Sequence, residues 1–303
     1  MSTLNDDQAF YAFDPTLEPL LTVAQKEQFI LYTQDCFANQ LKSDEDTLDD
    51  LDWDHINPAT GPVAIKGVKP GDVVRISIDK LEMIGKSVMT TIPGSGAISG
   101  ITEATTRVMA NSDGVLAVAT DLGELKLPLK PMIGVIGLAP AAGSIPNGTP
   151  GTHGGNMDCN LIGEGASLYI RAAVEGGLFG CGDSHALMGD GEVLVCGAET
   201  PARVSATACV VEEPALPTPF VETADLYAAI ASADSTDAAV KLAIDNMFDF
   251  LTKVVGLGQG DAGRLMSLIG NLRFCQVVDP KITIRFEFPK ATLAELGFKG
   301  IGA

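Results

Sequence analysis

The sequence predicts a mainly β protein built from short strands joined by tight turns. Its 303 residues include 33 glycines and 17 prolines, while aromatic residues make up only 6%, which is typical of a chain that turns often. Apolar and polar residues also alternate over residues 74–79, after the turn at 70–72, and this period of two indicates a half-buried strand. Regularly spaced short strands favour a β-sandwich or a β-barrel.

The same criteria mark further elements along the chain. We read an irregular arm before residue 28 and an exposed loop over 43–54, where seven of twelve residues are acidic. The other segments with short apolar runs between glycine, proline or aspartate are predicted strands at 28–33, 115–119, 125–129, 133–138, 167–172, 192–197 and 282–288.

The chain changes character after the prolines at 214–219, which suggest a boundary. We therefore expect a β-sandwich core in residues 1–213 that carries the functional site. Residues 214–303 should form a helix pair and final strands packed on that core. Apolar residues spaced by three and four from Val240 to Val254 predict one helix ending at Gly256. A second helix is predicted from about Asp261 to Leu272, with Leu265, Leu268 and Ile269 buried.

Composition excludes several classes of function. The 20 basic and 39 acidic residues give a net charge of −19 without any basic patch, so nucleic acid would be repelled. The most apolar tract, 132–142, is too short to cross a membrane. Six scattered cysteines without a Cys-x-x-Cys pair, and no basic-then-apolar leader, indicate a reducing cytoplasm. An uncharged or cationic small substrate suits such an acidic protein.

Histidine is rare, and its placement suggests a site. Of three histidines, His185 lies within residues 154–199 and His153 directly beside that stretch, which also contains Asp158 and Asp183. Carboxylate oxygen and imidazole nitrogen are ligands of catalytic zinc and related divalent ions. Asp183 and His185 would project on the same side of an extended segment and so share an ion.

Two residues from earlier segments are candidates for the remaining ligands. We expect His55 to complete the shell, and Asp35 to bind the same ion or a second one. The structural alternative is that the aspartates beside glycine bond turn amides and that the histidines are simply hydrogen-bonded. His153 fits a turn or supporting role better than a ligand role.

Other residues of this stretch suit roles in catalysis. Glu192, after the Gly189-Asp190-Gly191 turn, is a candidate general base for water on the metal. Gly155 lets the backbone approach a ligand, and Asn156 offers a donor and an acceptor to a small polar substrate. Cys159 and Cys181 raise the alternative of a thiol nucleophile, although free cysteines are mostly buried small hydrophobes.

Several segments together resemble the acetamidase/formamidase family. They are, in the family's order, Thr60-Gly61-Pro62, Gly67-Val68-Lys69-Pro70-Gly71-Asp72, Pro131-Met132-Ile133-Gly134-Val135-Ile136-Gly137, His153-Gly154-Gly155-Asn156-Met157-Asp158, Gly182-Asp183-Ser184-His185, Gly189-Asp190-Gly191-Glu192 and Cys275-Gln276-Val277-Val278. The chain departs from the family pattern after Asp35, where paired glycines are often found, and at Asn271-Leu272, where the family has a small acid; both departures concern the substrate more than the chemistry.

The resemblance implies hydrolysis of short amides such as formamide or acetamide to a carboxylate and ammonia. It implies a β-sandwich, jelly-roll-like, with helices in a small α/β C-terminal portion, and a homo-oligomer. Asp35, His55, Asp158, Asp183 and His185 match polar motif residues of the family, which supports a metal site, with zinc as the expected ion and calcium possible at a second site. The alternatives are a hydrolase of urea, guanidine or an amidine, and a non-catalytic β-sandwich module that holds structural calcium.

Overall fold

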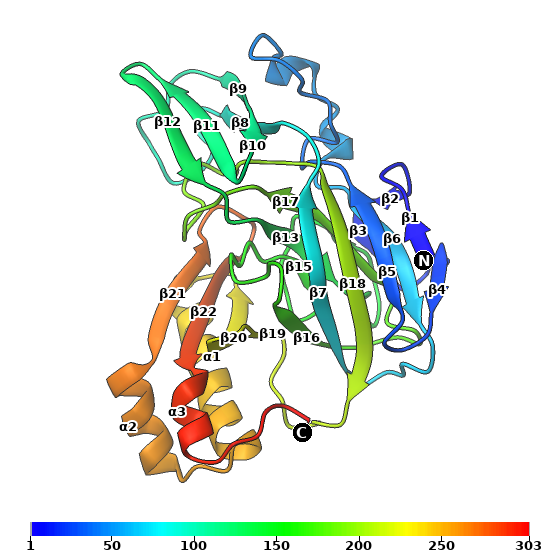
Figure 1. Cartoon of the computed structure of the whole chain (residues 1–303), viewed down its shortest axis with the longest axis vertical. Helices are drawn as coiled ribbons and strands as arrows, with labels where there is room; N and C mark the ends of the chain where they lie inside the picture. Colours follow the sequence, from blue (N-terminus) through cyan, green and yellow to red (C-terminus); the bar gives the residue numbers. More distant parts are fainter. Residues whose placement is uncertain (1, 303) are drawn as a thin grey trace.

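The computed structural model describes residues 2–302 and is mainly β, as predicted (Figure 1). Its largest sheet has nine strands, most of them antiparallel, and the long central pair β7 and β18 has one register shift between Ser205 and Ala206. In spatial order these strands are β1 (Ser2–Leu4), β5 (Gln28–Thr33), β18 (Ala202–Val211), β7 (Val73–Met83), β16 (Ser167–Arg171), β19 (Phe220–Glu222), β20 (Leu226–Ala233), β22 (Ile282–Pro289) and β21 (Asn271–Gln276).

A second sheet of six strands packs against the first. Its order is β15 (Gly154–Asn156), β13 (Met132–Gly137), β17 (Phe179–His185), β6 (Ala59–Ile65) and β2 (Ala9–Phe10), with β4 (Leu21–Val23) also paired to β6. Buried side chains of both sheets form one core, in which the Phe29 ring of β5 meets the Phe179 ring of β17 at 5.8 Å. Two sheets sharing one apolar interior make a β-sandwich.

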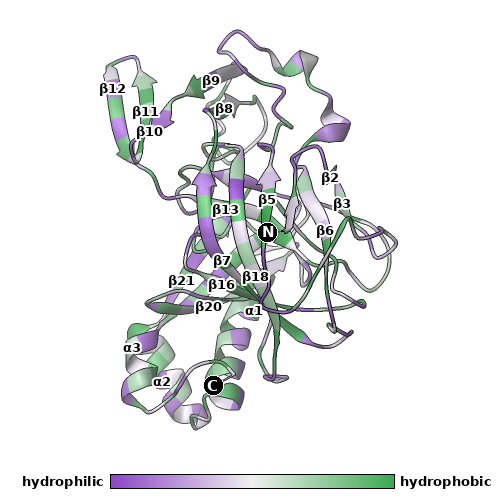
Figure 2. Cartoon of the chain, turned by 45° about the vertical axis from the view of Figure 1, so that its right-hand side comes forward, coloured by the Kyte–Doolittle hydropathy of each residue, from purple (hydrophilic) through white to green (hydrophobic). Residues whose placement is uncertain are grey.

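Short strands form the edges and one end of the molecule. The hairpins β8 (Ser87–Thr91) with β9 (Thr105–Met109), and β10 (Asn111–Ser112) through β11 (Val115–Thr120) to β12 (Gly123–Pro128), lie at the end opposite the helices in both views (Figures 1 and 2). Strands β3 (Ala12–Phe13) and β14 (Ile145–Pro146) pair with each other. The acidic loop over 43–54 contains only two single 3-10 turns, Leu48–Asp50 and Trp53–His55.

Three α-helices gather at the other end, where they carry both hydrophobic and hydrophilic residues (Figure 2). They are α1 (Thr236–Asp249), which continues as a π-helical turn over Phe250–Val254, α2 (Gln259–Ile269) and α3 (Lys290–Glu295). Ser235 caps α1 by accepting from the Ala238 amide. Phe250 packs on Phe220 and Tyr227 in a second apolar cluster. No helix among residues 2–302 is long and apolar enough to cross a membrane.

The C-terminal part does not form a separate sheet. Its strands β19, β20, β22 and β21 extend the nine-stranded sheet directly from β16. In α2 the buried side chains are Ala262 and Met266, whereas Leu268 is 76% exposed, so the prediction that Leu268 is buried is wrong. The helix also ends at Ile269, and Leu272 already pairs with Phe286 in the sheet.

Candidate active site

Strand β17 carries the first two candidate ligands into the interior. All seven of its residues are buried, and it lies between β13 and β6. Asp183 and His185 converge as expected, with His185 Nε2 only 3.4 Å from Asp183 Oδ1. Asp183 nevertheless departs from regular strand geometry, because its φ is +50°, a value that non-glycine residues seldom adopt.

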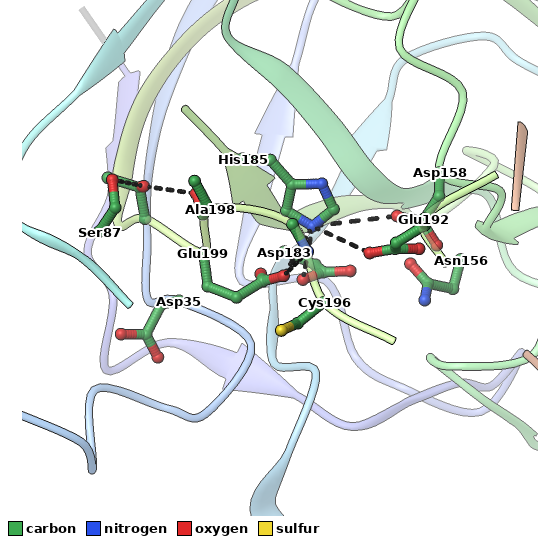
Figure 3. A network of polar contacts seen from close by, with 12 residues as sticks. Asp35, Ser87, Asn156, Asp158, Asp183, His185, Glu192, Cys196, Ala198 and Glu199 are labelled. Carbon is green, nitrogen blue, oxygen red and sulfur yellow. Dashed lines mark hydrogen bonds and ion pairs between the residues drawn. The ribbon is translucent and has the colours of Figure 1, made fainter. Parts of the chain in front are cut away.

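Four carboxylates surround this imidazole (Figure 3). His185 Nε2 lies 3.2 Å from Glu199 Oε1, 3.9 Å from Glu192 Oε1 and 4.0 Å from Asp158 Oδ1, in addition to the contact with Asp183. All five side chains are buried. So many acidic groups in one dry location repel one another and require a cation or bound protons.

Many polar atoms of this cluster have no hydrogen-bond partner. Both carboxylate oxygens of Asp158 and both ring nitrogens of His185 make no hydrogen bond, although Nε2 is close to the four carboxylates. One oxygen of Asp183 and one of Glu199 are unpaired as well. Such buried atoms are costly unless something satisfies them. Ligand atoms held at about 2.1 Å by one tetrahedral ion lie about 3.4 Å apart, close to the spacings seen around His185.

The donor atoms form two groups that each fit a divalent cation. One consists of Asp158, His185 and Glu192, and the other of Cys36, Asp183 and Glu199; within each group the ligand atoms lie within 4.8 Å of one another. Oxygen and nitrogen in the first group suit zinc or a similar ion. The second group adds a thiol, which binds as thiolate and would therefore favour a softer metal over calcium.

The protonation of these groups reflects burial and crowding. Burial raises the pKa of Asp158 and of Glu192, and their carboxylate neighbours raise both further. Burial also raises the pKa of Glu199 to about 8. Burial opposes the charge of Asp183 too, yet the adjacent His185 lowers the pKa of that carboxyl. The carboxylates in turn raise the pKa of His185 against the opposing effect of burial.

Three residues of the cluster have a left-handed backbone conformation. Besides Asp183, Asp158 and Glu192 each have a φ of +45°. Residues persist in such conformations where the surrounding structure imposes them, and they cluster at functional sites. Gly134 of β13 permits the crowding, because a Cβ there would lie 2.7 Å from Asp183 Oδ2 and also strike Asp158 Oδ1.

Glu192 reaches the cluster from a turn, so the prediction of a strand over 192–197 is wrong. The turn is tied to the C-terminal part, since the Gly191 amide donates to the Cys275 carbonyl and the Val277 amide donates to the Gly191 carbonyl. Val195, with a φ of +82°, turns the chain again. The apolar run after Glu192 suggested a strand, but these bends direct the carboxylate inward instead.

A cavity of about 610 Å³ adjoins the cluster. Asp183, Glu192 and Glu199 contribute to its lining, together with Asn156 and Asp279. Asn156 Nδ2 donates to Asp279 Oδ2 at 3.0 Å, while Asn156 Oδ1 is buried without a partner. Carboxylate residues and Asn156 thus line a space that admits a small molecule.

The other candidate residues have different surroundings. Asp35 Oδ1 accepts from the Phe37 and Asn39 amides, and its carboxylate lies apart from the cluster in Figure 3. His55 Nδ1 bonds Asp52 at 2.7 Å, and its side chain is 55% exposed. Neither Asp35 nor His55 belongs to either donor group. The structure therefore does not bring them together with His185 as predicted.

Gly155 and His153, which precede Asn156 in the sequence, are structural in their contacts. Gly155 lies in β15 opposite Ile136, and a Cβ there would come within 2.5 Å of the Thr149 carbonyl. It therefore lets the 147–149 loop pack closely. His153 is buried against the Phe13 ring at 5.3 Å, and burial lowers its pKa to about 4.

Sequence reasoning missed three polar residues of the site: Cys36, Glu199 and Asp279. Cys36 directly follows Asp35, whose bonds to the loop amides shape the turn that presents the thiol. Glu199 stands at the end of an otherwise apolar run, a signal that the sequence does contain. Asp279 lies far along the chain beside Pro280 and shows no such signal.

Comparison with known proteins places the chain in a family. The sequence profile of the acetamidase/formamidase family matches residues 2–147 and 141–213. The crystal structure of an acetamidase from Bacillus halodurans superposes with a TM-score of 0.94, at 37% identity, over 98% of this chain and 100% of that one. An acetamidase/formamidase assigned by prediction, from Thermoanaerobacter tengcongensis, gives a TM-score of 0.93 at 42% identity, over 99% of both chains.

A curated protein of Schizosaccharomyces pombe, named provisionally as a formamidase, is 21% identical over 222 residues. The match covers 54% of this chain and 54% of that protein, so the chain spans about half the length of this curated relative. The family profile covers well over half of the sequence, and the solved structures match throughout. The chain therefore belongs to the acetamidase/formamidase family.

Proposed function

We propose that the protein is a metal-dependent amidohydrolase that cleaves a linear amide into a carboxylate and ammonia. The observation that carries this proposal is the buried cluster around His185, whose unpaired oxygen and nitrogen atoms converge beside a cavity. Family membership supports the reaction, because the similar solved structures are named as acetamidases or formamidases. The substrate is a small, uncharged amide.

Asp158 and His185 would hold a divalent ion, zinc being the expected metal, together with Asp183, whose Oδ1 lies 3.4 Å from His185 Nε2. Glu192, the third member of the first donor group, is then left free to act as a base. When bound, such an ion polarises a carbonyl and lowers the pKa of water to about 7. Glu199 and Cys36 offer a second set of donors around Asp183. Ligand atoms must be deprotonated to bind metal, so a cation would bind against the raised pKa of Asp158 and of Glu199.

Glu192 is the proposed general base. It faces the cavity, and its pKa is raised mainly by burial and then by Asp158, which brings a carboxylate toward the range useful for proton transfer near neutral pH. Glu192 takes a proton from the attacking water and delivers it to the departing nitrogen, which leaves as ammonia. Asn156 lines the cavity and its Oδ1 has no hydrogen-bond partner, so this side chain would accept from the substrate N–H and orient the amide.

The test of the proposal is ammonia release from formamide, acetamide and propionamide by protein prepared with and without a chelator. We expect release that the chelator abolishes and added zinc restores. Glu192→Gln should retain bound metal but lose about 10²–10⁴-fold in kcat. The Asp121→Asn variant is a matched control, because Asp121 is an exposed turn residue. No ammonia from any of these amides with metal-replete protein would contradict the proposal.

The setting of the enzyme is part of the same proposal. All six cysteines are buried and free, which suits a reducing cytoplasm, and we propose a homo-oligomer. Light scattering of the purified protein would give its mass in solution, and a single-chain mass would contradict the oligomer.

A further inference from the structure

We propose that the preferred substrates are neutral primary amides with a bulky apolar acyl group of about the size of a phenyl ring, rather than formamide or acetamide. This inference rests on the proposed function and deepens it. The first observation is the size of the cavity at the cluster, about 610 Å³. A water molecule occupies about 30 Å³, and acetamide has only a few times that volume. Acetamide would therefore leave most of the cavity to solvent.

The second observation is the chemistry of the cavity wall. Three aromatic side chains line it, those of Tyr11, Phe37 and Trp53, together with the aliphatic Ile56 and Ile92. They come from three separate parts of the chain: the segment between β2 and β3, the loop after β5 that extends into the acidic segment, and the end of β8. A pocket with an apolar wall and a few polar groups is the usual arrangement for a ligand that is apolar at one end and polar at the other.

The third observation is charge. No lysine or arginine is among the described residues that line the cavity. The lining does include five acidic residues: Asp54, Asp183, Glu192, Glu199 and Asp279. An amide substrate that also carries a carboxylate would therefore meet repulsion without a compensating cation. A neutral acyl group contacts the aromatic wall without that cost. The amide end then lies at Asn156 and Glu192.

The energetics predict how strongly the enzyme should discriminate. Each methylene placed in an apolar pocket improves kcat/KM by about 10-fold or more. Phenylacetamide should therefore be hydrolysed with a kcat/KM at least about 10-fold above that of acetamide. Succinamate is also extended but carries a carboxylate, so its kcat/KM should be lower than that of phenylacetamide by a similar factor.

Trp53 offers a variant that tests the wall without touching the cluster. Its side chain is 48% exposed, so Trp53→Ala should fold normally. We expect the ratio of kcat/KM for phenylacetamide to kcat/KM for acetamide to fall by about 10-fold in the variant. Leu268→Ala is the matched control, because Leu268 is exposed on α2 and does not line the cavity. Equal or higher kcat/KM for acetamide in the unmodified protein, or an equal loss on both amides in Trp53→Ala, would overturn the inference.

Direct binding separates this inference from the proposed function. Trp53 is the only tryptophan in the sequence, so its fluorescence reports on the cavity alone. Titration of the Glu192→Gln protein with phenylacetamide should change the emission and saturate, and acetamide should do neither at the same concentrations. This result would support the inference even if no amide were hydrolysed. Unchanged emission with phenylacetamide would overturn it even if acetamide were a good substrate.

Discussion

At the scale of single residues, the environment of His185 Nε2 dominates the site. Four carboxylates lie within 4.0 Å of this atom, and their mutual repulsion makes the cluster a poor contributor to stability on its own. The site is therefore expected to be stabilised by a cation and strained without one. This trade of stability for function is common where charges are assembled for catalysis.

Replacement of Asp158 exposes this trade. Asp158→Asn removes a buried carboxyl group whose two oxygens make no hydrogen bond and which has other carboxyl groups as neighbours. In the presence of a chelator the variant should therefore be more stable by about 1–3 kcal/mol and unfold at a higher temperature. Calorimetry with chelator measures this gain, and elemental analysis without chelator should show lost metal. A lower unfolding temperature of the variant in chelator would contradict the expectation.

Asp35 gives a prediction on pH dependence. Burial raises its pKa from 3.8 to about 6, so the folded protein keeps a proton that an unfolded aspartate has already lost. Unfolding then releases a proton, and stability falls as pH rises from about 4 to about 6. Asp35→Asn should remove this fall in stability. The fall amounts to about 3 kcal/mol at most, because a change of one pKa unit corresponds to about 1.4 kcal/mol. Denaturant titrations across this range, with Asp121→Asn as control, measure it; an unchanged slope would count against a buried Asp35.

At the scale of elements, two neighbouring strands determine the geometry of the cluster. Strand β17 supplies Asp183 and His185, and β13 lies beside it with glycine at position 134. The close approach of Gly134 to both aspartates leaves no room for a side chain. Geometry at the site thus depends on a residue that makes no polar contact with the substrate.

Gly134→Ala tests this dependence. The new methyl group must displace Asp183 or Asp158, and a shift of about 1 Å at a catalytic site can cost about 10²-fold in rate. Gly189→Ala is the matched control, since a Cβ at Gly189 meets nothing within 4 Å. Ammonia release by the two variants should differ by about this factor. Comparable activity in both would show that the close packing at Gly134 is unimportant.

The elements also show what the sequence can and cannot predict. The strand over 28–33 is confirmed residue for residue, because a short apolar run is a local signal. The segment over 192–197 misled for the opposite reason. Gly191, just before it, bonds Cys275 and Val277, which are distant in the sequence, and positive φ values at Glu192 and Val195 bend the apolar run. Local patterns likewise revealed the polar residues near His185 but not Cys36, whose role depends on the loop that Asp35 shapes.

At the scale of the whole molecule, the C-terminal part completes the site that the first two thirds of the chain begins. Asp279 bonds Asn156, and the strand β22 carries Arg285, whose guanidinium pairs with Asp190 at 2.8 Å in the turn before Glu192. Arg285 also bonds Glu287 at 2.7 Å and is buried. No local sequence pattern could predict this assembly, since it depends on the nine-stranded sheet continuing past the prolines at 214–219.

Arg285→Met should therefore affect both stability and catalysis. Loss of one partner from a buried ion pair costs about 3–5 kcal/mol, and the turn that carries Glu192 loses its attachment to β22. Chemical denaturation and ammonia release measure the two effects. Arg264→Ala is the control, because its pair with Asp261 is exposed and should contribute less than about 1 kcal/mol. Full activity in Arg285→Met would separate the C-terminal part from the site.

The most direct test of the central claim is the metal content of the purified protein, measured together with ammonia release before and after chelation. We predict at least one divalent ion per chain, and loss of both metal and activity in His185→Ala. In the unmodified protein, ammonia release should return when zinc is added back after chelation. Undiminished ammonia release from chelated protein shown by elemental analysis to be free of metal would contradict the account.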